Sequence, residues 1–119
     1  MDDLELKQRT KEFAHRCVKL ALELPNGQLG KHISGQLIRC ATSVAANYRA
    51  SCIAQSKASF ISKLSIVLEE SDESSFWLEF IIDEQLMKTN LIAPLLNEAN
   101  ELTAIFFSSR KTARRKNEN

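Results

Sequence analysis

The sequence predicts an all-α protein, an antiparallel up-down-up-down four-helix bundle. The chain of 119 residues contains only three glycines and two prolines, far fewer turn residues than an all-β domain needs. Apolar residues recur at three- and four-residue steps in four segments, which is the spacing of one face of a helix. The breaks between these segments are short, as expected for antiparallel neighbours in a bundle.

The first two helices are each indicated by an apolar stripe and a stop signal. The first is expected over about Asp3 to Leu24 and ends at the Pro-Asn-Gly segment at 25–27, because proline cannot continue the helical hydrogen-bond ladder. The second is expected over about Lys31 to Ala54. This helix is rich in alanine and serine, whose small side chains let a neighbouring helix come close.

The boundaries of the third and fourth helices are predicted from a capping residue, a stop signal and a proline. Ser56 suits the N-cap of the third helix, because its hydroxyl can accept an unpaired backbone N–H. This helix is expected to reach about Lys88, with Thr89-Asn90 as its stop. Pro94 then fits the first turn of the fourth helix. We interpret residues 1–119 as a single domain whose basic tail, 110–119, loses helical order.

Two rows of side chains are expected along the third helix. The deepest row consists of Ile61, Leu64, Leu68, Ser71, Ser75, Leu78 and Ile82. The second row consists of Ile66, Glu70, Glu73, Trp77 and Ile81. An apolar arc this wide on a small bundle indicates burial against another subunit.

An ion pair between the second and third helices follows from their antiparallel register. With the turn near 55–56, paired residues have numbers that sum to about 112. Arg39 then lies level with Glu73 and within reach of Glu70, and a guanidinium can bind both carboxylates. Arg16 of the first helix lies about level with Arg39 and is a further candidate. With Trp77, these residues predict an ion-pair seam that acts in assembly.

Catalytic sites are less well supported by the residue pattern. A di-metal carboxylate site in a bundle needs two Glu-x-x-His motifs, and the chain has one, Glu12 to His15. Side chains of His15 and Cys17 point about 200° apart on a helix, and phosphate-binding glycine motifs are absent from the sequence. We therefore predict no enzymatic activity, no metal and no cofactor, with a di-metal enzyme as the weakest alternative.

Basic residues gather in two stretches although the net charge is only +1. No acidic residue occurs between Glu23 and Glu69, and the tail from Arg110 is almost purely basic. Such strips can contact phosphates, and oligomerisation would multiply them. A structural alternative is that the basic side chains of the tail interact favourably with the negative end of the helix dipole at the C-terminus. The predicted RNA- or DNA-binding residues are Arg49, Lys57, Lys63, Arg110, Lys111, Arg114, Arg115 and Lys116.

The cysteine count and the hydropathy of the chain indicate the cellular compartment in which the protein is expected. The three cysteines are an odd number, and without a signal-peptide pattern they indicate reduced thiols in a cytoplasmic protein. No apolar run approaches the length of a membrane span. We therefore expect a cytoplasmic protein with no membrane partner.

Two segments resemble a known family. The segment QLIRCATSVAANYRA at 36–50 matches at Gln36, Leu37, Arg39, Ser43, Val44, Asn47, Tyr48 and Arg49, and FISKLSIVLEESDESSFWLEF at 60–80 matches at Leu64, Glu70, Glu73, Trp77, Leu78 and Glu79. Together they resemble the second- and third-helix signatures of the four-helix bundle proteins encoded within intervening sequences of bacterial 23S ribosomal RNA genes. The resemblance extends from about Lys7 to Phe107 and adds Asn47 to the predicted seam.

The resemblance implies architecture more than activity. It implies a homopentamer of antiparallel bundles with a central channel. More distantly, the sequence is similar to accessory proteins of the reverse transcriptases of diversity-generating retroelements, whose basic pentamers contact nucleic acid. This chain departs from that group because its charge is nearly balanced. The function expected is a non-enzymatic oligomeric interaction module that binds RNA or DNA, with a protein-binding or structural assembly as the alternative.

Overall fold

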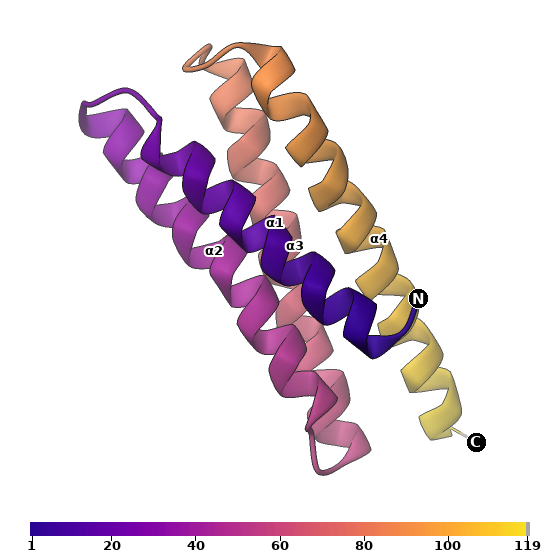
Figure 1. Ribbon diagram of the computed structural model, residues 1–119. Coiled ribbons are helices and arrows are strands. Elements are labelled where there is room, and N and C mark those ends of the chain that lie inside the picture. The colour runs from indigo at the N-terminus through magenta and orange to yellow at the C-terminus, as the bar shows by residue number, and fades with distance from the viewer. Residues whose placement is uncertain (119) are drawn as a thin grey trace.

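The protein is a bundle of four long helices, which confirms the all-α prediction (Figure 1). The computed structural model describes the backbone of residues 1–118 and the side chains of residues 1–116. The helices are α1 (Asp3–Leu22), α2 (Gln28–Cys52), α3 (Lys57–Asp83) and α4 (Thr89–Glu118). The molecule measures 51 × 21 × 20 Å. No helix in the described part of the chain is long and apolar enough to cross a membrane.

Each helix packs against the next one in the chain, and α1 also packs against α4. Helices α1 and α3 therefore lie on one diagonal of the bundle, and α2 and α4 on the other. This arrangement is consistent with the up-down-up-down order. The α2–α3 loop lies at the same end of the bundle as the end of α4 (Figure 1).

The beginnings of α1 and α3 are capped by side chains. Asp2 Oδ1 accepts a hydrogen bond of 2.8 Å from the backbone N–H of Glu5. Ser56 Oγ accepts one of 3.0 Å from the N–H of Ser59, so the predicted cap at Ser56 is confirmed. Each bond satisfies a donor that the first helical turn leaves unpaired.

The loop between α1 and α2 is tighter than expected, so α2 begins at Gln28 and not near Lys31. Gly27 lies at φ 143°, which a residue with a side chain rarely adopts. A Cβ on Gly30 would lie 1.9 Å from the carbonyl oxygen of Pro25. The first turn of α2 can therefore pack under Pro25 only because Gly30 has no side chain.

The predicted boundary between the last two helices is wrong. Helix α3 ends at Asp83 and not at Lys88, and Gln85 adopts the left-handed φ of 54° that closes it. The N–H of Leu86 donates to the carbonyl of Ile81 at 3.1 Å, which satisfies an end carbonyl. Glutamine rarely takes this conformation, so no residue type marked the stop. Thr89 consequently begins α4, and Pro94 lies inside that helix.

The expected loss of helical order in the basic tail is not found in residues 110–118, and residue 119 lies outside the described residues. Helix α4 continues through Arg110 to Glu118. Ala113 is only 7% exposed, which shows that this last part of the helix still packs against the bundle. Packing of an apolar face, more than local propensity, maintains a helix of this kind.

One hydrophobic core runs through the bundle. Its largest fully buried side chains include Phe13, Ile33, Leu64, Leu102 and Phe106. On α3 the buried set is rotated from the expected one: Val67, Ser74 and Ile81 are buried, whereas Ile61, Leu68 and Ile82 are only partly buried. Ser74 of this set contacts α2 and Ser71 contacts α4, and their small side chains allow both helices to come close.

Serine hydroxyls in this core bind both their own helix and its neighbours. Ser74 Oγ donates to the carbonyl of Glu70 at 2.8 Å and lies 3.3 Å from Cys40 Sγ on α2. Thr103 Oγ1 on α4 donates to Ser71 Oγ at 3.0 Å. No buried side-chain nitrogen or oxygen of the described residues lacks a partner, so these polar groups fix the helix register without an unpaired group.

Candidate assembly seam and basic surfaces

The Arg39 seam consists of Arg39 on α2 and Glu70, Glu73 and Trp77 on α3. Arg39 Nη1 donates to Glu70 Oε2 at 3.0 Å, and Arg39 Nη2 donates to Glu73 Oε2. The two helices thus pair in the register that the turn near 55–56 requires. The side chain of Arg39 is 49% exposed and that of Glu70 is 18% exposed, so this surface network contributes little net stability.

Glu73 is held as a carboxylate. Partial burial opposes its charge, but hydrogen bonds from Arg39 and from Trp77 more than offset this and lower the pKa of Glu73. Trp77 Nε1 donates to Glu73 Oε2 at 3.1 Å. The same hydrogen bond to Glu73 raises the pKa of Arg39. Both groups therefore stay charged near neutral pH and act as a fixed pair, not as an acid or base.

An aromatic cluster extends the seam towards the surface. The ring of Trp77 meets His32 of α2 edge-on at 5.6 Å between centroids, and it meets Phe76 at 4.9 Å and Phe80 at 6.0 Å. Phe76 is nevertheless 50% exposed. The cluster is therefore a packed platform with one side open to solvent.

Two residues assigned to the seam lie outside it. Asn47 is two turns further along α2, and its Nδ2 donates to the Ser43 hydroxyl at 2.9 Å. Arg16 forms no ion pair with any described residue. The role of the seam in assembly stays a prediction.

An ion-pair cluster between α1 and α4 was missed by the sequence reasoning. Arg9 Nη2 lies 2.6 Å from Glu98 Oε1 and 3.3 Å from Glu101 Oε2, and Arg9 Nε donates to Glu98 at 2.8 Å. This fork binds the carboxylate of Glu98 with two hydrogen bonds. Because α1 and α4 are not joined by a loop, no turn length indicated their register.

The carboxylates of the bundle are not gathered into a metal-binding cluster. No group of three or more His, Cys, Asp or Glu side chains in the described part of the chain is placed to hold a metal ion. Glu12 and His15, the single candidate motif, are exposed on α1. Both side chains line the groove between α1 and α2, without a third His, Cys, Asp or Glu of the described residues placed to complete a metal site.

The predicted basic residues fall on two separate surfaces, one at the end of the bundle where α3 begins and α4 ends, and one between α1 and α2. Lys57 at the start of α3 and Lys116 near the end of α4 line one hollow of about 470 Å³, together with Phe60 and Ala113. Arg110 points towards α3, with Nη1 3.4 Å from Ser65 Oγ. On the outside of α4, three basic residues are exposed: Lys111, Arg114 and Arg115. Lys63 is partly buried on α3.

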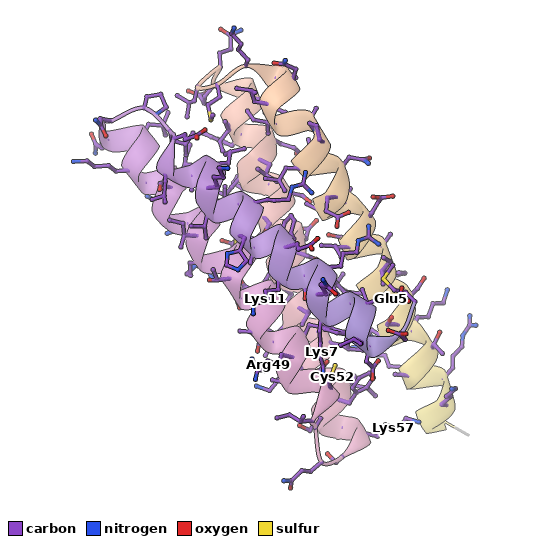
Figure 2. All side chains as sticks on the ribbon, viewed as in Figure 1. Glu5, Lys7, Lys11, Arg49, Cys52 and Lys57 are labelled. Atoms are coloured by element: carbon purple, nitrogen blue, oxygen red, sulfur yellow. The ribbon has the colours of Figure 1, made fainter. Side chains whose placement is uncertain are left out.

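Arg49 lies elsewhere, in an open groove of about 820 Å³ between α1 and α2. Figure 2 shows Arg49 on α2 and, on the neighbouring α1, Lys7 and Lys11. The groove is also lined by small residues, including Ala45 and Ala46. The sequence reasoning did not single out Lys7 and Lys11, although their spacing of four residues places them on one helical face.

The remaining reactive groups are cysteines. Burial raises the pKa of Cys40 to about 11 and that of Cys17 further. Both are buried, and Cys52 is only partly exposed. The three thiols are free, and the raised pKa values of the buried pair make them poor nucleophiles.

Comparison with known proteins agrees with this architecture. No curated protein matches the chain. A crystal structure of a protein of unknown function from the S23 ribosomal protein family of Bacteroides thetaiotaomicron is similar, with a TM-score of 0.85 and 36% sequence identity. The match covers 93% of this chain and 99% of the other. The sequence model of the 23S rRNA-intervening sequence proteins matches residues 2–108. The chain therefore belongs to the 23S rRNA-intervening sequence protein family.

Proposed function

We propose that the protein is a non-enzymatic, homo-oligomeric interaction module that binds RNA or DNA through a basic surface at the end of α4. The proposal places it in the cytoplasm, in keeping with its three free thiols. A pentamer is the assembly that the family resemblance implies. The proposed contact is with the phosphate backbone, because the residues of this surface that carry charge are lysines and arginines.

The observation that carries the proposal is the meeting of two acid-free segments. Residues 57–68 of α3 contain no acidic residue, and neither do residues 102–117 of α4. Ser71 bonds to Thr103 and Ser65 to Arg110, so the first segment lies beside the second in antiparallel register. These two segments, about 45 residues apart in the chain, thus meet without contributing a carboxylate, and Asp3 of α1 is the carboxylate that lines a neighbouring hollow with Lys57. Repulsion of phosphates by the two segments themselves is therefore small.

Basic side chains are concentrated on this surface. Lys57 and Lys116 face the same hollow, and Lys111, Arg114 and Arg115 project from the adjoining turns of α4. The dipole of α4 places partial negative charge at this end, but the basic side chains outweigh it. In an oligomer the surface would be repeated, which raises the affinity for a long polyanion by linking several weak contacts.

Salt dependence of binding provides the test. We expect nuclease-treated protein to bind a generic single strand and a generic duplex in fluorescence anisotropy. The logarithm of the binding constant should fall linearly with that of the salt concentration, by about 0.9 per phosphate contact on duplex DNA. Absence of binding at low salt would reject the proposal.

Matched variants locate the surface. Arg114→Ala/Arg115→Ala should weaken binding and reduce the salt slope by about two. Lys31→Ala/Lys88→Ala removes the same charge from exposed positions elsewhere and should leave the slope unchanged. Equal effects of the two pairs would mean that only net charge matters, which contradicts a defined surface.

A protein-binding assembly without nucleic acid is the second candidate, and the exposed half of Phe76 favours it. It is supported if the purified oligomer retains a protein partner after nuclease treatment and fails to bind either nucleic acid at low salt. Retention of nucleic acid with steep salt dependence would decide for the first candidate.

A further inference from the structure

An acidic ridge runs along the outside of α3. It consists of Glu69, Asp72, Phe76, Glu79 and Asp83, all of which are exposed. Their steps of three, four, three and four residues place them on one helical face, about 21 Å long at 1.5 Å per residue. Their four carboxylates form no ion pair with any described residue. Phe76 stands at the centre of the ridge, 50% exposed.

The α1/α2 groove has the complementary character. Lys7, Lys11 and Arg49 line it, and none of them forms an ion pair within the described part of the chain. Its lining extends from Leu4 to His15 on α1, about 17 Å at 1.5 Å per residue. Alanines on α2 leave room for a bulky side chain. Glu12 is its one carboxylate, so the cations remain in excess.

We propose that the acidic ridge of one copy docks into the α1/α2 groove of a second copy. Phe76 would enter the alanine-lined part, and the carboxylates on either side of it would face Lys7, Lys11 and Arg49. This inference rests on the oligomeric part of the proposed function and names the two surfaces that meet. It also accounts for two features left unpartnered within the subunit, an exposed aromatic ring and a row of unpaired cations.

The same subunit cannot supply the ridge, and a second copy carries a ridge that matches the groove in length and charge. Helices α1 and α3 lie on a diagonal of the bundle without contact, so the ridge faces away from the groove of the same subunit. The lengths of ridge and groove are similar and their charges are opposite, which favours encounter of these two surfaces over like-charged ones. Such a contact joins two different surfaces and is therefore heterologous. The resulting assembly is a closed ring or an open filament, depending on the rotation between successive copies.

Charge reversal on each surface, alone and combined, provides the test. Lys11→Glu/Arg49→Glu makes the groove acidic, and Asp72→Lys/Glu79→Lys makes the ridge basic. Each pair alone places like charges opposite one another and should raise the protein concentration needed for assembly at least about tenfold. The chain with all four substitutions regains opposite charges and should assemble within about threefold of the parent. Light scattering of nuclease-treated protein gives the mass at each concentration.

Two controls keep the result interpretable. Lys31→Glu and Glu23→Lys reverse exposed charges outside both surfaces and should assemble as the parent does. Far-UV circular dichroism should show the same helix content in every variant, because all of the changed positions are exposed. A variant that lost helix content would be replaced by the corresponding alanine pair, with the same expected direction.

Each outcome of these experiments supports or refutes the docking of the ridge into the groove. Normal assembly of both single-surface reversals overturns the inference, and so does failure of the fourfold variant to recover. If the groove reversal weakens nucleic-acid binding but leaves the mass unchanged, the groove binds nucleic acid and the proposed docking is wrong. A parent protein that is monomeric at all concentrations refutes the oligomeric part of the proposed function itself. An oligomer insensitive to every reversal refutes only the docking.

Discussion

Replacing Phe76 with alanine should weaken assembly more than it weakens the subunit. An aromatic side chain buries about 150–250 Å² when fully covered. Phe76 is 50% exposed, so about 100 Å² remains for a partner to cover. At about 25 cal/mol per Å² this area corresponds to about 2.5 kcal/mol, or about 70-fold in the association constant of each contact.

The packed half of the same ring sets the effect on the subunit. Phe76 meets Trp77 at 4.9 Å and Phe80 at 5.8 Å between ring centroids. Losing these contacts should lower the free energy of unfolding by about 1–2 kcal/mol. Urea unfolding of dilute protein measures the free energy of unfolding. Sedimentation or light scattering over a concentration series measures the association constant.

Leu102→Ala is the matched control. Leu102 is fully buried, so its truncation should lower the free energy of unfolding by about 2–5 kcal/mol while the association constant stays unchanged. Phe76→Ala should show the reverse order of effects. An unchanged association constant in Phe76→Ala, or an equal loss in both variants, would refute the reasoning that the exposed ring is covered by a partner.

Three further predictions concern the seam and the thiols. Trp77→Ala removes the ring that supports Phe76 and packs on His32, so both assembly and the subunit should be weakened, and the free energy of association should become less favourable by about 2 kcal/mol if Trp77 is an anchor; an unchanged oligomer mass would count against that role. The pKa of Glu73 is lowered from 4.5, so its stabilising effect is complete above that pH and is lost as the pH falls through the lower folded-state value. Arg39→Met should therefore destabilise the protein at pH 7 and make the decline in stability below about pH 5 shallower, as acid titrations of urea unfolding would reveal; an identical pH profile would contradict this. A thiol reagent should modify Cys52 much faster than the two buried cysteines in the folded protein, and equal rates at all three would be inconsistent with the core described.

Local features of the chain could be inferred from residue types because their causes are local. The cap at Ser56 depends on one hydroxyl beside the first turn. The pairing of Arg39 with α3 depends only on a short loop that sets the antiparallel register. The end of α3 escaped prediction because Gln85 adopts a left-handed conformation that its residue type disfavours.

The number of helices and the register of α2 against α3 were determined by the sequence itself, whereas the buried face of α3 was decided by its packing in the bundle. Hydrophobic periodicity indicates which side of a helix is buried, and a short loop allows only one antiparallel register for two consecutive helices. Contacts between helices that no loop joins were decided by the tertiary structure. The fork of Arg9 on Glu98 depends on how four stripes close around one core. In the closed bundle the side chains of all four helices together fill the core at close-packed density. This requirement cannot be read from any one segment of the sequence.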